Sequence, residues 1–415
     1  MRSRITLAIL FAFTICFGPA RAAKVPAGDM DSLKIVYFGS SVPWGYGASK
    51  GLGYTYVFNE ILKKRAANGT GKNWTTANIS KGGDNTIKVL ARWSKELTPQ
   101  KGKYVVYALS LGNEGIHEAG KPRLDQFKAN MTKLIAMARD SGYVPVITNC
   151  YTRNDFNEKD YGFVKDLNLW INALNVPSVN VLGAVDNGFG KWAPAFWSDP
   201  AHPNNAGHAE MAYTIVPSLF DALANGKPQP QWADGSPYTF KGKQPISFKP
   251  DNTLHPFTTS ITIKADGKGR IMQLTDSTKH VGSIAIKDNG TVEYTSPLYQ
   301  QITGTTKITD GKWHKISLTH YYARNQTLLY CDSTLQGTVQ ERIVLKELSI
   351  GDKSAKIEAK SWLFYRSGMN LSEIAALTNN TLLKSSLELY APLNGLSKDV
   401  LVNLAQSTVA LTCIK

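Results

Sequence analysis

The sequence predicts a parallel, three-layer α/β domain followed by an antiparallel β-sandwich. From Lys34 to about Ala222, near-continuous apolar segments alternate with segments of helical periodicity. This alternation is expected for a parallel sheet covered on both faces. Residues 224–237 are rich in Gly, Pro and polar residues, which is typical of a linker. Beyond them, short alternating runs are separated by Asp-Gly and Asn-Gly pairs, as in antiparallel sandwiches.

The α/β part is expected to contain five strand–helix units. The apolar segments predicted as strands are 34–39, 74–80, 104–111, 143–150 and 178–182. The segments with helical periodicity are 53–66, 86–97, 124–138, 163–174 and 205–223. Pro122 lies near the start of the third helix and Gly142 follows its end, as helix boundaries favour. In such open sheets, ligands bind beyond the carboxyl ends of the strands.

The sandwich is predicted from short runs in which apolar residues alternate with polar ones. These runs are 259–263, 284–286, 316–318, 328–330 and 343–345. They are too short and too regularly interrupted by turn residues to be helices. Periodicity alone leaves open whether they form a jelly roll or an immunoglobulin-like sandwich.

The amino terminus has the pattern of a secretory signal peptide. Arg2 and Arg4 precede an apolar run, Ile5 to Phe17, that is too short to span a bilayer comfortably. Residues 20–22, Ala-Arg-Ala, fit a cleavage site. We therefore expect a signal peptide at 1–22 and a secreted, periplasmic or cell-surface protein without stable membrane insertion. The expected domains are then 23–223 and 238–415, joined by the linker at 224–237.

Length, charge and cysteine content restrict the classes of function. A chain of 415 residues exceeds one ordinary core, so two or three domains are expected. Signal removal takes away Arg2, Arg4 and Arg21 and lowers the net charge from +15 to +12. This surplus favours acidic partners such as anionic polysaccharide. The lysines are scattered, however, and together with export this argues against nucleic acid as a partner.

The cysteines predict neither a disulfide framework nor a metal site. Cys16 leaves with the signal peptide, and Cys150, Cys331 and Cys413 remain. An odd number excludes complete pairing. Cys331 and Cys413 lie in the same predicted domain, and export permits a bond between them. No metal-ligand spacing is present, so no metal or cofactor is expected.

Polar segments follow the predicted strands where a ligand site is expected. Residues 39–45 follow the first strand, 82–86 the second and 112–115 the third. Residues 199–203 precede the last helix. Because the carboxyl ends of parallel strands share one edge, these four segments should converge.

Together the four segments contain what acyl transfer needs. The reaction requires a nucleophile, a base, a group that orients the base, and donors for the oxyanion. Ser41, at a strand-to-helix turn, suits the nucleophile, His202 the base and Asp199 the orienting group. The backbone N–H groups of Ser41 and Gly83 and the amide of Asn113 are candidate oxyanion donors. Taken singly, each of these residues is more often a cap or turn residue.

Elimination supports His202 as the base. Apart from it, the exported α/β part contains His117 and His208. His117 has no carboxylate as well spaced as Asp199, although Glu114 and Glu118 are close in sequence. His208 lies within the last predicted helix and is expected to be a packing or surface residue.

Residues 39–45 resemble the first conserved block of the SGNH (GDSL-like) hydrolases. Gly83, Gly112-Asn113 and Asp199-x-x-His202 resemble the other blocks in family order. The resemblance covers roughly Lys34 to Leu223. It implies a flavodoxin-like fold, with hydrolysis of esters or thioesters through Ser41, Gly83, Asn113 and His202 and without a metal.

The sequence departs from the family pattern at three positions. Ser40 replaces the usual Asp of the first block, Leu111 the first Gly of the third block and Glu114 its final Asp. Gly112 and Asn113 are kept, so the expected donor remains. Gly82 and Gly83 are adjacent, and the donor is assigned to Gly83 because it directly precedes the polar turn.

The second domain resembles laminin-G and concanavalin-A-like sandwiches. The resemblance rests on residues 309–316 and 327–332, with a closing segment at 371–374 and 389–395. It implies a jelly roll that either binds glycans or packs against the catalytic domain. Aromatic residues flank the predicted site and serve either as sugar platforms or as filler. They are Trp44, Tyr46, Trp192, Phe196 and Trp197.

Three functions are compatible with these features. The leading hypothesis is a carbohydrate esterase that removes O-acetyl groups by a Ser-His-Asp acyl-enzyme mechanism. A lipid or thioester hydrolase would use the same residues with an apolar acyl tunnel. An inactive glycan-binding protein is the third, and the intact Ser41, Asp199 and His202 argue against it.

Overall fold

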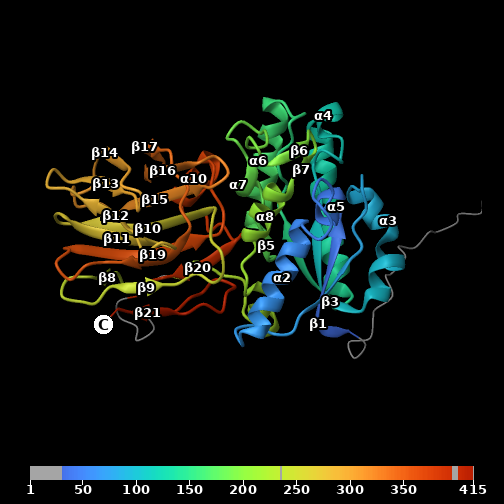
Figure 1. The fold of residues 1–415 in the computed structure, drawn as a ribbon, viewed down its shortest axis with the longest axis horizontal. Coiled ribbons are helices and arrows are strands. Elements are labelled where there is room, and N and C mark those ends of the chain that lie inside the picture. The colour runs from blue at the N-terminus through green and yellow to red at the C-terminus, as the bar shows by residue number, and fades with distance from the viewer. Residues whose placement is uncertain (1–29, 234–235, 395–400, 415) are drawn as a thin grey trace, which may run out of the picture.

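The computed structural model describes residues 30–233, 236–394 and 401–414. Figure 1 shows two bodies side by side: a sheet with helices on both faces, and a sandwich of two β-sheets. Both parts of the predicted fold class are therefore confirmed. The expected signal peptide, residues 1–22, lies outside the described residues.

A five-stranded parallel sheet forms the centre of the α/β part. Its strands are β1 (Asp31–Gly39), β2 (Thr75–Asn78), β3 (Gly102–Ala108), β4 (Val144–Thr148) and β5 (Ser178–Val179). They are arranged in the order β2-β1-β3-β4-β5. This is the flavodoxin-like doubly wound order, in which the chain reverses direction beside β1 and β3.

Helices cover both faces of this sheet because its strands are apolar on both sides. In β1, Val36 and Phe38 face one core cluster, and Ile35 and Tyr37 face the other. The first cluster includes residues of α3 (Thr86–Leu97), α5 (Lys121–Asp140) and α6 (Glu158–Ala173). The second includes residues of α2 (Tyr54–Ala67), α8 (Asn205–Tyr213) and α9 (Leu219–Ala224). Shorter elements complete this part: α1 (Ser41–Trp44), η2 (Thr98–Gln100), α4 (Ile116–Ala119), α7 (Leu182–Val185), β6 (Trp197–Asp199) and β7 (His202–Pro203).

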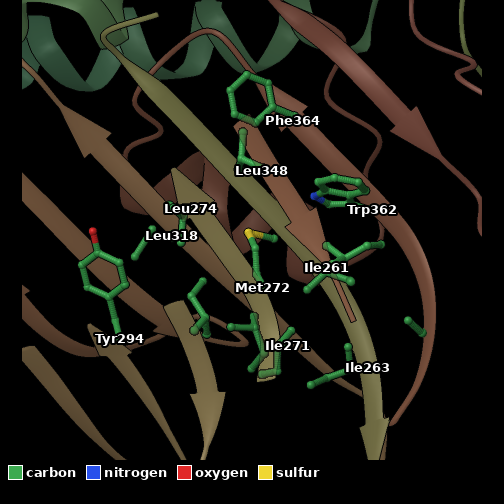
Figure 2. Close-up of a cluster of buried hydrophobic side chains, with 14 of the residues drawn as sticks. Ile261, Ile263, Ile271, Met272, Leu274, Tyr294, Leu318, Leu348, Trp362 and Phe364 are labelled. Atoms are coloured by element: carbon green, nitrogen blue, oxygen red, sulfur yellow. The ribbon is translucent and has the colours of Figure 1, made fainter. Parts of the chain in front are cut away.

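The sandwich consists of two antiparallel sheets. One contains β17 (Thr334–Val339), β16 (Gln326–Cys331), β15 (His314–Tyr321), β10 (Phe257–Ala265), β19 (Ile357–Tyr365) and β20 (Leu387–Ala391) in that order, with β8 (Tyr238–Thr239) beside β19. The other contains β14 (Gln301–Lys307), β13 (Thr291–Thr295), β12 (Val281–Ile286), β11 (Gly269–Asp276), β18 (Leu345–Ile350), β9 (Ile246–Phe248) and β21 (Leu411–Cys413). Helix α10 (Leu371–Thr378) lies between β19 and β20 in sequence. Figure 2 shows the core between the sheets, with Ile261, Met272, Leu348 and Trp362 among the buried side chains.

Most predicted elements are present with bounds that differ by a few residues, and the differences include the following three. The helix expected at 205–223 is two helices, because Pro217 lacks an N–H and would clash with the carbonyl of the preceding turn. The fifth strand ends at Val179, since Leu182 already begins α7. The strand expected from Ile343 begins at Leu345.

The pairing considered for Cys331 and Cys413 is not formed, and both residues are free thiols. Cys331 is buried in β16 of one sheet, whereas Cys413 is exposed in β21 of the other. Strand β16 contacts β14 at one edge of the second sheet, whereas β21 is the strand at the opposite edge of that sheet. The two thiols are therefore too far apart for the short Cα separation that a disulfide needs. The two-sheet architecture therefore separates two cysteines that sequence alone places in one domain.

The two parts of the chain are joined by buried polar contacts as well as by the segment between α9 and β8. The amide of Asn180, just beyond β5, donates to Glu373 Oε1 of α10 at 2.7 Å. The carboxylate of Asp186 pairs with Arg324 of the sandwich at 2.8 Å. Leu169 of α6 packs against an apolar cluster of the sandwich. Buried contacts of this kind resist separation, because parting would leave polar groups unpaired.

No helix within the described ranges is long and apolar enough to cross a membrane.

Candidate active site

Ser41 lies directly beyond the carboxyl end of β1. At Gly39 an added Cβ would lie 2.0 Å from the carbonyl oxygen of Ala108, so only glycine allows β1 and β3 to approach this closely at their ends. The chain then turns, and Ser41 begins α1 with 8% of its surface exposed. The turn places the Ser41 hydroxyl at the sheet edge where a ligand site was predicted.

His202 connects Ser41 to Asp199. His202 Nε2 is 2.9 Å from Ser41 Oγ, and its Nδ1 is 2.8 Å and 2.9 Å from the two carboxylate oxygens of Asp199. Asp199 and His202 lie opposite each other in the short β6–β7 ladder. Asp199 can only accept at Nδ1, so Nδ1 carries the proton and Nε2 is free to accept from the serine hydroxyl. This is the arrangement of a nucleophile, a base and an orienting carboxylate.

The Asp199 carboxylate is held ionised. Partial burial opposes ionisation, but the N–H of Ala201, which donates to Oδ1 at 2.8 Å, and the ring of His202 outweigh it. The pKa of Asp199 is therefore below its usual range. A negative charge at this position stabilises an imidazolium when His202 takes up a proton.

The loop after α1 packs against the loop that carries His202. Gly47 has φ +89°, and a Cβ there would lie 2.3 Å from the carbonyl oxygen of Pro203. The ring of Tyr46 lies 4.7 Å from the ring of His202, centroid to centroid. His208 of α8 holds this loop by two hydrogen bonds. Its Nε2 donates to the carbonyl of Tyr46, and its Nδ1 accepts from the N–H of Tyr54. Burial lowers the pKa of His208 to about 4, so the ring is neutral and its role is structural.

His117 is not part of this arrangement. It is half exposed on α4, and its Nδ1 lies 2.7 Å from Asp160 Oδ2 of α6. The sequence argument that His117 lacks a suitable carboxylate was therefore incomplete, because the partner is 43 residues away. His117 does not line the pocket beside Ser41.

The predicted oxyanion donors face Ser41 from two neighbouring loops. Gly82, Gly83 and Asn113 line the same pocket as Ser41 and His202. In the described part of the chain, the N–H groups of Gly82 and Gly83 donate to no protein acceptor. Gly83 adopts φ +71°, with open space where a Cβ would lie. One amide hydrogen of Asn113 is used to donate to the carbonyl of Asp84 at 3.0 Å, which leaves the second hydrogen for a ligand.

Glu114, which stands where the SGNH pattern has Asp, connects the loops that contain Gly83 and Asn113. Its buried carboxylate accepts from the N–H and the hydroxyl of Thr86 at 3.0 Å and 2.5 Å, and from Gln126 at 2.6 Å. Asp84 is likewise buried and pairs with Arg92. These contacts fix the loop of Gly83 relative to the loop of Asn113. The longer Glu therefore has a structural role here.

Arg153 is a pocket residue that the sequence analysis missed. Its guanidinium pairs with Asp155 through Nε at 2.9 Å, and Nη1 lies 3.4 Å from the side-chain oxygen of Asn113. A Cβ on Gly112 would lie 2.6 Å from Nη1, so glycine is needed for this approach. Arg153 follows β4, and its place beyond a buried strand is the signal that would have identified it.

The pocket has a volume of about 420 Å³, within the range of small-molecule sites. Tyr151 and Arg153 from the loop after β4 complete its wall. Three of the five flanking aromatic residues are exposed: Trp44 by 50%, Tyr46 by 58% and Trp197 by 41%. The other two, Trp192 and Phe196, are buried and fill the core.

One group of potential metal ligands lies elsewhere, in the sandwich. Among the described residues, ligand atoms of His314, Cys331 and Asp332 lie within 4.8 Å of one another. Burial raises the pKa of Cys331 to about 12, which keeps the thiol protonated, whereas metal binding requires the thiolate. His314 is already hydrogen-bonded to both Asp310 and Asp332. This group is therefore better explained by its internal hydrogen bonds.

Residues 37–210 match the model of the GDSL-like Lipase/Acylhydrolase family. The matched range contains all five predicted site residues, namely Ser41, Gly83, Asn113, Asp199 and His202. This part of the chain is thus similar to the GDSL-like lipases and acylhydrolases, a class of hydrolases that act on ester bonds. The comparison with curated proteins gives no match.

Solved structures resemble the two parts of the chain separately. A putative lipolytic protein of the G-D-S-L family from Desulfitobacterium hafniense is 12% identical, covering 43% of this chain and 95% of its own, with a TM-score of 0.37. An acetyl xylan esterase from Geobacillus stearothermophilus is 16% identical, covering 44% and 93%, with a TM-score of 0.34. Domains LG4-5 of the mouse laminin alpha1 chain are 10% identical, covering 35% and 45%, with a TM-score of 0.28. At these values the neighbours say nothing about the substrate of this chain.

Proposed function

We propose that this protein is a secreted serine esterase that removes O-acetyl groups from carbohydrate. The observation that carries the proposal is the continuous hydrogen-bonded chain from Ser41 through His202 to Asp199, beside an open pocket. If these residues were only helix caps or turn residues, their side chains would not need to be hydrogen-bonded to one another in this order. The three members of this hydrogen-bonded chain come from two segments that are 161 residues apart.

In the proposed reaction, Ser41 Oγ attacks the ester carbonyl carbon while His202 Nε2 takes up the serine proton. The N–H groups of Ser41 and Gly83 and the amide of Asn113 donate to the oxyanion. His202 then gives the proton to the departing sugar oxygen, which leaves an acyl-enzyme on Ser41. Water then attacks the carbonyl carbon of the acyl-enzyme while His202 takes up its proton. His202 returns the proton to Ser41 Oγ as the free acid leaves, which restores the serine. Asp199 stays ionised throughout and holds the ring.

Carbohydrate as the substrate class is supported by the rim of the pocket. Tyr46 lines the pocket and is 58% exposed. Trp44 and Trp197, which are 50% and 41% exposed, belong to α1 and β6, the elements that contain Ser41 and Asp199. Exposed indole and phenol rings can stack on sugar rings. Arg153 and Asn113 add polar donors to the wall. A long-chain acyl ester would instead call for a deep apolar tunnel. The polar wall and exposed rings favour a short acyl group on a large polar alcohol.

The proposal is tested with the mature protein and its Ser41→Ala variant on acetylated oligosaccharides, a small acetyl ester and long-chain acyl esters. We expect turnover of the acetyl substrates and a loss of roughly a thousandfold or more in kcat for the variant, with an unchanged melting temperature. Turnover unaffected by Ser41→Ala would refute the site. A preference for long-chain acyl esters would refute carbohydrate as the substrate class and indicate a lipid instead.

The mechanism uses no metal and no cofactor, so EDTA is expected to leave kcat unchanged. Strong inhibition that is reversed by added metal would contradict it.

A further inference from the structure

The sandwich contains a pocket of about 460 Å³ that shares no residue with the pocket at Ser41. Trp313, Lys315 and Asp332 line it, and they come from the two segments on which the laminin-G resemblance rests. Lys360 of β19 and Trp232, from the segment before the sandwich, complete it. The esterase mechanism uses none of these five residues.

The two indoles are held in place yet remain accessible. Trp232 is 36% exposed, its Nε1 donates to the carbonyl of Asn380 at 2.5 Å, and its ring meets Tyr390 edge-on at 5.4 Å. Trp313 is partly exposed, and Lys360 Nζ lies 4.5 Å from its ring centroid. Aromatic rings that are fixed before binding lose little entropy when a ligand stacks on them.

The charge of the pocket comes from two ammonium groups. Lys315 is buried, with 5% of its surface exposed, although burying an ammonium group is costly. Its Nζ donates to the carbonyl of Leu377 and lies 5.7 Å from the ring of Trp232. An ammonium group has three donors, and within the described ranges no acceptor is found for the other two of Lys315 or for any of Lys360.

The carboxylate in the pocket hydrogen-bonds to other groups, although its charge partly opposes the lowering of the Lys315 pKa by burial. Asp332 accepts from His314 Nδ1 at 3.0 Å and from the backbone N–H of Lys315 at 2.9 Å. No ion pair joins it to the ammonium group of Lys315 or Lys360 in the described part of the chain. The pocket thus presents two cations with spare donors beside two indoles.

We propose that this pocket binds an acidic saccharide, with a pyranose ring on the indoles of Trp232 and Trp313 and its carboxylate at Lys315 and Lys360. Pyranose rings present C–H groups that stack on indoles. A carboxylate satisfies the spare donors of the lysines with charge-assisted hydrogen bonds. The net charge of the chain, +15, favours approach of an acidic polymer. This site goes beyond the proposed esterase and does not depend on it.

The test measures binding of penta-galacturonate and of neutral xylopentaose to the full-length mature protein by titration calorimetry. Neither probe carries an ester, so binding and hydrolysis at Ser41 are independent readouts. We expect binding of the acidic probe that weakens with salt. Trp313→Ala and Lys360→Ala should each weaken it at least tenfold.

Matched control variants lie in the other sheet of the sandwich and in its β13–β14 turn, which contains Tyr299. Tyr299→Ala removes a ring that is 78% exposed, and Lys346→Ala removes an exposed lysine of β18. Both are expected to bind the acidic probe like the wild type. If a pocket variant has a lowered melting temperature, the test is made on the wild type instead: the acidic probe is expected to quench its tryptophan fluorescence, and no quenching would count against the pocket. Equal affinity for the neutral probe, absence of binding, or equal losses in pocket and control variants would overturn the proposal.

Discussion

Replacing Arg324 by Ala should disturb the active site although Arg324 belongs to the sandwich. Its Nη2 pairs with Asp186 at 2.8 Å, where the two side chains are 13% and 2% exposed. Asp186 follows α7 and opens the loop that leads to Asp199 and His202. The substitution leaves a buried carboxylate without its cation.

The size of the effect follows from what remains around Asp186. Removing one partner of a buried ion pair costs about 3–5 kcal/mol. The hydroxyl of Tyr161 still donates to Asp186 at 2.7 Å and the N–H of Gly190 at 3.2 Å. We therefore expect the lower end of the range, about 3 kcal/mol in the free energy of unfolding. We also expect a roughly ten- to hundredfold loss in kcat, because a small displacement of His202 breaks its alignment with Ser41.

Urea unfolding and kcat on a small acetyl ester measure the two effects. Asp186→Asn in the Arg324→Ala background removes the orphaned charge and should restore part of both. Arg270→Ala is the control: Arg270 is one-third exposed and lies 3.6 Å from Asp352, so its removal should cost less than about 1 kcal/mol. Arg324→Ala within about 0.5 kcal/mol of the wild type, with kcat within twofold, would refute the idea that the sandwich supports this loop.

Three further results are expected. His202→Ala should lower kcat about as much as Ser41→Ala, the double variant little more and Asp199→Ala less, because the triad acts as a unit; additive losses would contradict this. Ending the chain after Gly235 should reduce turnover of small and polymeric esters alike, since the truncation exposes apolar side chains of the α/β part that pack against the sandwich. If the truncated protein turned over the small ester at the full rate, the sandwich would be only tethered to the α/β part. Binding of penta-galacturonate should weaken as pH rises through about 8. Burial lowers the pKa of Lys315 to about 8, an effect that Asp332 opposes and Lys360 adds to, so the ammonium charge is present only below that pH. Affinity that is constant to pH 10 would exclude Lys315 as a ligand.

The sequence predicts well which residues meet at this edge of the sheet, because the signals that mark them are local. Each strand is a short apolar segment followed by polar residues, and parallel strands bring their carboxyl ends to one edge. Asp199 and His202 are three residues apart, so their contact needs only a turn. Ser41 and His202 then meet because α1, which follows β1, contacts β7.

What the sequence does not predict are contacts between distant segments with no periodicity to mark them. Arg153 reaches Asn113 across 40 residues, and the approach depends on Gly112 having no side chain. The pairing of Asp186 with Arg324 spans 138 residues. In the sequence, these charged residues look like ordinary surface residues. Their partners become evident only when the fold brings the segments together. The break at Pro217, by contrast, was readable from the rule that proline interrupts a helix.

The packing of the two bodies decides how the two pockets cooperate. A flexible linker would let the sandwich search a volume around the catalytic domain, and the gain from tethering would then depend on linker length. Here Asn180 donates to Glu373 and Asp186 pairs with Arg324 in buried positions, so the span between the pocket at Trp313 and Ser41 is fixed by the fold. Because this distance is fixed, only a ligand that is itself long enough can occupy both pockets at once. An acidic oligosaccharide too short to span both pockets gains nothing from the second one, whereas a polymer long enough to occupy both benefits from a high effective concentration at Ser41.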